Sequence, residues 1–350
     1  MILSNQYIKY NSREIDLLKF VLAIFVVGLH TLSVDFIGRP ILRFGVPIFF
    51  IISSYLFFLK QGTCGSAAER KQALVRYVKR VFKLYLFWLV VLLPITIYSN
   101  KWHINPGFDT IVMVVRNFFF SYTFAGSWFL MALIIGMSVV WFLGEKKMHD
   151  FWIVLIGIVL YLLCCMSSTY HDLVTKVPSL AEALNSYEKV FTEPHNSFPA
   201  GIIFIAMGRI LAQRAFHVSN KVLVIITGLL LALMYCEHFM LRSIGKIMSN
   251  DCYLMLPPLC LCLFMLVGQN TKFKLTFDTR PLRAYSTIIY CSHMTIAFCL
   301  YGVLRYFVVY ESTIYHLIAF PTTLALSLLL SYVILKLERR KGCALLKYSH

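Results

Sequence analysis

Two residues of the first apolar stretch, Lys19 and His30, have types and a spacing that could do chemistry. Their separation is close to three full helical turns, so both side chains would lie on one helix face, about 16 Å apart along the axis. Asp16 lies one turn before Lys19 and could pair with it. Imidazole titrates near neutral pH, so His30 is a candidate general base in an elongated site. Alternatively, Lys19 only extends towards a membrane surface and His30 only hydrogen-bonds to a neighbouring helix.

A second cluster consists of four cations at helical spacing, where a later apolar stretch begins. These cations are Arg76, Lys79, Arg80 and Lys83. They would form a basic stripe on one helix face. Such a stripe could hold phosphate groups, with Arg making forked contacts and Lys acting as a point charge. The alternative is that they are ordinary flanking charges beside anionic lipid headgroups.

The segments that must position these residues are unusually apolar. Of 350 residues, 59% are hydrophobic and 14% are charged, whereas soluble domains average about 45–50% and about 25%. The net charge of +17 could indicate nucleic-acid binding. The basic residues, however, lie mainly in short stretches between apolar runs, as in membrane proteins. We therefore expect a lipid bilayer, and no nucleic acid, as partner.

We predict an all-α integral membrane protein with about ten transmembrane helices, because a span needs about 20 mostly apolar residues. Residues 1–350 would form a single polytopic membrane domain. With the N-terminus inside, the cytoplasmic segments carry more than twice as many Lys and Arg residues as the outer ones, which predicts that both termini are cytoplasmic. No His and Cys residues occur at ligand spacing, so we expect no metal. The candidate spans cover residues 15–33, 44–59, 81–99, 128–144, 151–168, 198–213, 221–240, 253–268, 285–307 and 315–337.

Five patterns follow one another along the chain. They are Asp16, Lys19, ten residues and His30; Gly45 to Tyr55; Lys79 to Lys83; Ser127 to Leu130; and Tyr285 to His293. Together they resemble the integral-membrane acyltransferase family usually called acyltransferase 3, over about residues 13–300. Lys19, Lys79 and Lys83 stand where that family has Arg, and Ser54 stands where Gly is usual. Lysine keeps the charge but loses the planar fork.

The resemblance implies acyl transfer from a cytoplasmic acyl-CoA, with acetyl-CoA as the expected donor, to a hydroxyl of a cell-surface or exported glycan. His30 would be the base, and Lys19, held by Asp16, would lie near the thioester. The basic stripe would hold the phosphates of coenzyme A. Trp128, Tyr290 and His293 would line the substrate cavity, with His293 as a second base, an orienting group or simply a core histidine. A bacterial cell membrane is the expected location.

Within the family, the chain is most similar to the membrane half of vancomycin-resistance serine racemases, in which a soluble pyridoxal-phosphate domain follows. The sequence ends at His350, so we expect no racemase chemistry from it. A carrier of anionic or zwitterionic solutes is a second interpretation, for which Pro94 and Pro257-Pro258 are candidate helix breaks. A third is a relative that binds acyl-CoA without turnover.

Overall fold

The computed structural model is helical throughout the residues that it describes, which are 12–33, 35–99, 108–214, 216, 218–245, 251–269, 275–340 and 342–350. Within these residues, five helices connect the main apolar ones: α2 (Arg39–Leu42), α5 (Phe108–Phe120), α8 (His171–Val174), α9 (Pro178–Phe191) and η1 (Pro194–Asn196). The 3-10 helix η2 (Ala344–Tyr348) follows the last of the main apolar helices. The long helices are α1 (Ser12–Thr31), α3 (Gly45–Gln61), α4 (Ala67–Tyr98), α6 (Trp128–Glu145), α7 (Asp150–Ser167), α10 (Pro199–Gln213), α11 (Asn220–Ile244), α12 (Leu256–Gln269), α13 (Arg280–Leu304) and α14 (Thr313–Glu338).

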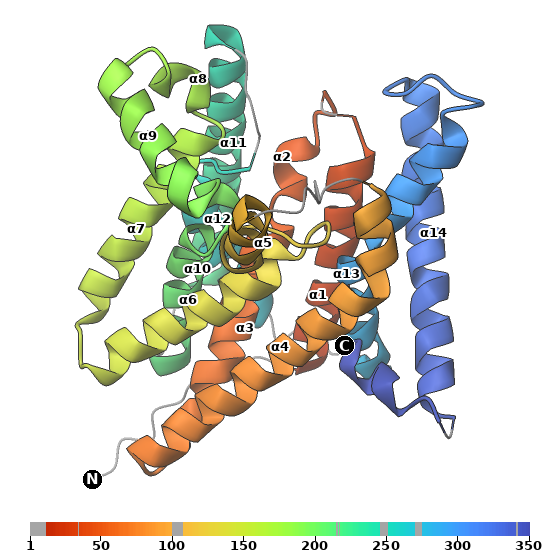
Figure 1. Cartoon of the computed structure of the whole chain (residues 1–350). Helices are drawn as coiled ribbons and strands as arrows, with labels where there is room; N and C mark the ends of the chain where they lie inside the picture. Colours follow the sequence, from red (N-terminus) through yellow and green to blue (C-terminus); the bar gives the residue numbers. More distant parts are fainter. Residues whose placement is uncertain are drawn as a thin grey trace.

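Four helices form the centre of the bundle: α3 packs along α10, and α1 packs along α13 (Figure 1). Their facing surfaces are apolar and closely packed, with Ile51, Ile205 and Ile288 fully buried. The Ser54 hydroxyl donates a hydrogen bond of 2.6 Å to the carbonyl oxygen of Ile205, which ties α3 to α10. Small and hydroxyl side chains of this kind allow close helix contacts inside a membrane.

Helices α4, α11 and α14 lie at the outside and expose apolar side chains. Val90 is 69% exposed, Ile225 is 68% exposed and Leu317 is 70% exposed. Contiguous apolar surface of this extent is unfavourable in water but suits the hydrocarbon core of a bilayer. The chain is therefore a multi-pass membrane protein.

Each predicted span coincides with one of the ten long helices, but the helices differ in their ability to cross a bilayer. Within the described part of the chain, seven helices are long and apolar enough to do so. Helices α10 and α12 are also apolar but have only 15 and 14 residues. Helix α1 has 20 residues, with Glu14, Asp16 and Lys19 in its first half. The all-α membrane fold is confirmed, whereas the count of about ten spans stays a prediction.

The two ends of the bundle are distinct. The upper end carries α2, α8 and α9, and the lower end holds the start of α1 and the segment η2 (Figure 1). Helix α1 rises from the lower end to the upper end, so that Lys19 and His30 point to different levels of the interior. These two levels contain two separate cavities.

Candidate functional site

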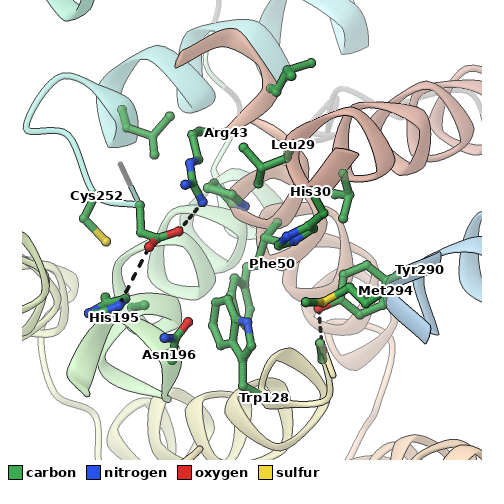
Figure 2. Close-up of a pocket in the computed structure, with 18 of the residues that line it drawn as sticks. Leu29, His30, Arg43, Phe50, Trp128, His195, Asn196, Cys252, Tyr290 and Met294 are labelled. Atoms are coloured by element: carbon green, nitrogen blue, oxygen red, sulfur yellow. Dashed lines mark hydrogen bonds and ion pairs between the residues drawn. The ribbon is translucent and has the colours of Figure 1, made fainter. Parts of the chain in front are cut away.

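The upper cavity has a volume of about 510 Å³ and lies among α1, α3, α6, α10 and α13. Its lining includes His30, Trp128, Tyr290 and His293, which come from three helices far apart in sequence. The Trp128 indole projects towards the space between His195 on one side and His30 on the other (Figure 2). Four residues predicted from the sequence are thus brought together in one cavity.

His30 and His293 form an imidazole pair, with ring centroids 5.3 Å apart and ring planes inclined by 40°. The His293 side chain is 1% exposed. Its Nδ1 atom lies 2.8 Å from the carbonyl oxygen of Tyr290 and 3.1 Å from that of Ile289. Carbonyl oxygens only accept, so Nδ1 carries the hydrogen and the neutral ring has its lone pair on Nε2. Backbone contacts of this kind fix the tautomer and the orientation of a histidine.

The His293 Nε2 atom is buried and has no hydrogen-bond partner within the described part of the chain. A buried acceptor without a partner is unfavourable. A ligand that brought an N–H or O–H group into the cavity could donate a hydrogen bond to this nitrogen and remove the penalty. Of the three imidazoles that line the upper cavity, His30 is exposed, His293 has its accepting nitrogen fixed in place, and His195 lies on the far side of the cavity.

The lower cavity has a volume of about 260 Å³ and is basic. Lys19, Arg80 and Arg283 line it, together with Ser53 and Tyr77. It is placed at the level of the first half of α1, below the imidazole pair. A cavity with three cations suits an anionic ligand.

Tyr290 belongs to the lining of both cavities. Its hydroxyl donates a hydrogen bond of 2.9 Å to the carbonyl oxygen of Gly126. Its ring centroid lies 5.2 Å from that of Phe129 and 6.1 Å from that of Phe49. Tyr290 and these two rings thus form the partition between a basic lower space and an imidazole-bearing upper space.

Asp16 has a different partner from the one expected. It was predicted to hold Lys19, but the structure pairs it with Arg283 of α13. Arg283 makes a forked contact, with Nε 2.9 Å from Oδ1 and Nη2 3.1 Å from Oδ2 of Asp16. A guanidinium fits both carboxylate oxygens at once, which an ammonium cannot do. This explains why Asp16 pairs with Arg283 and not with Lys19. Lys19 still lies beside this pair in the lower cavity.

All four cations of the basic stripe of α4 are exposed, and one of them also lines the lower cavity. That cation is Arg80. Arg76 and Lys79 are exposed, and Arg76 donates to Gln72 over 3.3 Å. The Lys83 ammonium lies 5.2 Å from the ring centroid of Tyr348, in η2. The structure therefore groups Arg80 with Lys19 and Arg283, and places the other three cations elsewhere.

Several charged residues of the two cavities were missed by sequence reasoning. Arg283 is not among the residues predicted from the sequence, since its partner is 267 residues away and no local spacing connects them. Arg39, Arg43, His195 and Asp251 line the upper cavity. The spacing of four between Arg39 and Arg43 was an available signal, because residues four apart share a helix face.

We expect Arg283→Ala to lower the thermal stability of the purified protein, because it leaves the Asp16 carboxylate buried without its fork. Removing one partner of a buried pair costs about 3–5 kcal/mol, but the Arg283 side chain is 58% exposed. Solvent screening reduces the expected cost to about 1–2 kcal/mol. Arg280→Ala is the matched control, because that side chain is 82% exposed and pairs with Asp278 in solvent. Equal unfolding temperatures for both variants would contradict a structural role of the Asp16–Arg283 pair.

The fold and the upper and lower cavities define a multi-pass membrane protein with a pair of neighbouring histidines in its interior cavity. Residues 12–335 match the family described as an acyltransferase domain, so the chain belongs to the acyltransferase 3 family. This confirms the resemblance of the five sequence patterns.

The chain is also similar to curated proteins named for another activity. It is 23% identical over 350 residues to an amino-acid racemase of Enterococcus faecalis, covering 95% of this chain and 47% of that protein. It is 25% identical over 276 residues to a serine/alanine racemase of Enterococcus gallinarum, covering 73% of this chain and 37% of that protein. The chain thus spans less than half the length of these relatives. No solved structure matches it significantly.

Proposed function

We propose that this protein moves an acyl group, most simply acetyl, from cytoplasmic acyl-CoA to a hydroxyl of a cell-surface or exported glycan. The observation that carries the proposal is the pair of cavities on either side of Tyr290, with Lys19, Arg80 and Arg283 in the lower one and the His30–His293 pair in the upper one. The donor would occupy the lower cavity and the acceptor the upper one. Membership of the acyltransferase family supports the reaction class.

We also propose how the chain lies in its membrane. Both termini, and with them the lower end, would face the cytoplasm, because the segments there are richer in Lys and Arg. Helices α1, α10 and α12 would complete about ten spans, within one domain over residues 1–350. Helix α10 is mostly buried among other helices, so it need not match the hydrocarbon thickness. The Enterococcus relatives support a bacterial plasma membrane.

The proposed reaction begins with proton removal by His30. As the imidazole takes the proton of the acceptor hydroxyl, the oxygen attacks the thioester carbonyl and the C–S bond breaks. The thiolate of coenzyme A leaves and takes up a proton, so that an ester and free coenzyme A are formed. His293 would orient His30 or the acceptor hydroxyl through its fixed Nε2 atom. Tyr290, Trp128 and the phenylalanine rings around them would keep water away from the thioester.

Arg80, Lys19 and Arg283 would hold the donor in the lower cavity. Arg80 would contact a phosphate of coenzyme A, with Lys19 and Arg283 nearer to the phosphopantetheine arm; the support is that all three line the same cavity. Arg76, Lys79 and Lys83 would attract the nucleotide at longer range from the surface of α4. This ranks the four cations of the stripe, which the sequence treated alike.

The carrier interpretation expects helices that are broken within the membrane. Helix α4 continues through Pro94, and Pro257-Pro258 lie in the first turn of α12. Proline is tolerated in the first turn of a helix. Neither proline position therefore produces the broken helix that a carrier would use.

The experiment is to incubate the purified chain with radiolabelled acetyl-CoA and measure both binding and slow release of free coenzyme A. Wild type should bind and turn over. Arg80→Ala should weaken binding by about 10–100-fold, because a hydrogen bond to a charged group contributes about 1.5–3 kcal/mol. Arg76→Ala, on the exposed face of the same helix, should weaken binding much less. If wild type neither binds nor hydrolyses acetyl-CoA, the donor assignment is wrong.

A further inference from the structure

The upper cavity contains a charged cluster that the transfer reaction does not use. Arg39, Arg43, His195 and Asp251 line the same cavity as His30. Figure 2 shows Arg43 and His195 on one side of the cavity and His30 and Tyr290 on the other. Charged groups within a membrane protein are costly, so such a cluster needs a structural or a functional reason.

Part of the cluster is satisfied internally. Arg43 forms an ion pair with Oδ1 of Asp251. The other oxygen of Asp251 lies 3.8 Å from Nε2 of His195, and Nδ1 of His195 lies 2.9 Å from the Ser167 hydroxyl. Asp251 thus lies between Arg43 and His195, and its negative charge balances the positive charge of Arg43.

The guanidinium groups retain unused donors. Arg39 contacts the carbonyl oxygen of Leu32 through Nη1, at a distance of 3.3 Å. The Nε atoms of both Arg39 and Arg43 are buried and have no hydrogen-bond partner in the described part of the structure. A guanidinium has five N–H donors, and each buried donor without an acceptor is unfavourable. An oxyanion in this cavity could accept from both side chains.

The charges also limit what kind of anion fits. Among the residues that line this side of the cavity, two guanidinium groups and one carboxylate leave one positive charge. Two further carboxylates lie outside the lining, Glu193 at 3.6 Å from Nε2 of His195 and Glu311 near Arg39. A ligand carboxylate carries one negative charge and would balance the positive charge of the lining. A phosphate monoester carries about −1.5 to −2 at neutral pH, so it would leave an excess of negative charge beside Asp251 and be repelled more strongly than a carboxylate.

We propose that the upper cavity binds a hydroxy acid group: Arg39 and Arg43 hold the carboxylate of the acceptor while its hydroxyl faces His30. This assignment rests on the proposed transfer function and adds the chemical class of the acceptor. An acidic sugar residue of a glycan and a small hydroxy acid share this chemistry. Both fit a cavity of about 510 Å³.

The test uses two matched sets of small probes. Glycerol, glycerate and glycerol 3-phosphate form one set, and glucose, glucuronate and glucose 6-phosphate form the other. For each probe we would measure the concentration dependence of the thermal stabilisation of the purified full chain. Acetyl-CoA-dependent transfer to the same probes is measured separately, so that binding and transfer are tested apart.

Glycerate and glucuronate should stabilise wild type at concentrations at least about tenfold lower than their neutral counterparts. Tighter binding of glucuronate than of glycerate would indicate that the acceptor is an acidic sugar residue. Tighter binding of glycerate would indicate that the acceptor is a small hydroxy acid. Arg39→Gln should remove the preference, and Arg39→Lys should weaken it because the fork is lost. Arg305→Gln should keep it, because Arg305 is exposed and bonded to the Tyr306 hydroxyl.

Equal stabilisation by neutral and carboxylate probes would overturn the subsite, as would an unchanged preference in both Arg39 variants. Stronger stabilisation by the phosphate probes would overturn the carboxylate assignment. If carboxylates bind selectively and no acyl group is transferred, the subsite stands and the transfer function fails. If transfer occurs equally to neutral and carboxylate probes, the transfer function stands and the subsite fails.

Discussion

Replacing His30 by alanine should lower the rate of acyl transfer by about 10²–10⁴-fold, the range that a positioned general base contributes. Binding of acetyl-CoA should change little, because in the proposed function the donor would lie among Lys19, Arg80 and Arg283 in the other cavity. The expected result is therefore a loss of turnover with the donor still bound. Single-turnover release of coenzyme A, measured beside equilibrium binding, separates the two quantities.

His149→Asn is a suitable control for this experiment. His149 is exposed at the start of α7 and accepts a hydrogen bond from the backbone of Phe151, which asparagine can also do. The His149→Asn variant should keep full acyl-transfer activity. His293→Ala should cause a smaller loss than His30→Ala if His293 only orients its neighbour. A large loss in His293→Ala together with an active His30→Ala would instead make His293 the base.

The location of the imidazole pair could be predicted from sequence, but only in part from local rules. Helical spacing places Lys19 and His30 on one face of α1, and the structure puts them at two levels of the interior. That His293 lies beside His30 follows from the packing of α13 on α1. No spacing rule connects residues so far apart, and the expectation came from the resemblance to a family.

The ion pair of Asp16 shows where local rules fail. The i, i+3 rule proposed Lys19 as the partner, since it considers only one helix. In the folded chain, Arg283 approaches from α13 and its guanidinium matches the carboxylate geometry better. Arg43 pairs with Asp251 for the same kind of reason, through a contact between distant segments. Pairing across helices depends on tertiary packing that hydropathy does not encode.

The helix boundaries were easier to predict than the crossing of the membrane. Apolar runs locate all ten long helices, because a buried helix and a lipid-exposed helix are both apolar. Helix α10 is buried on nearly all sides, whereas α14 exposes Leu317 and Leu329. A hydropathy window cannot distinguish these two surroundings. Sequence therefore predicts where the apolar helices are, but not which of them cross the bilayer.

Gly208→Ala should destabilise the protein by about 1–3 kcal/mol, the usual cost of inserting a carbon into a closely packed interior. A Cβ atom at this position would lie 2.5 Å from the carbonyl oxygen of Ile51 and 2.9 Å from the backbone nitrogen of Tyr55. Both neighbours are backbone atoms of α3, so they cannot move away without shifting the helix. Close approach of backbones at a glycine is a common basis of helix association in membranes.

The matched control is Gly228→Ala on α11, where no atom lies within 4 Å of the added carbon. There the substitution should be neutral or stabilising by up to about 1 kcal/mol, because alanine favours the helix over glycine. Thermal unfolding in detergent compares the two variants. Phe50 of α3 and Phe204 of α10 both line the upper cavity, so separating these helices should also lower acyl transfer in Gly208→Ala alone. Equal stability and activity of the two variants would show that the contact between α3 and α10 is looser than the structure describes.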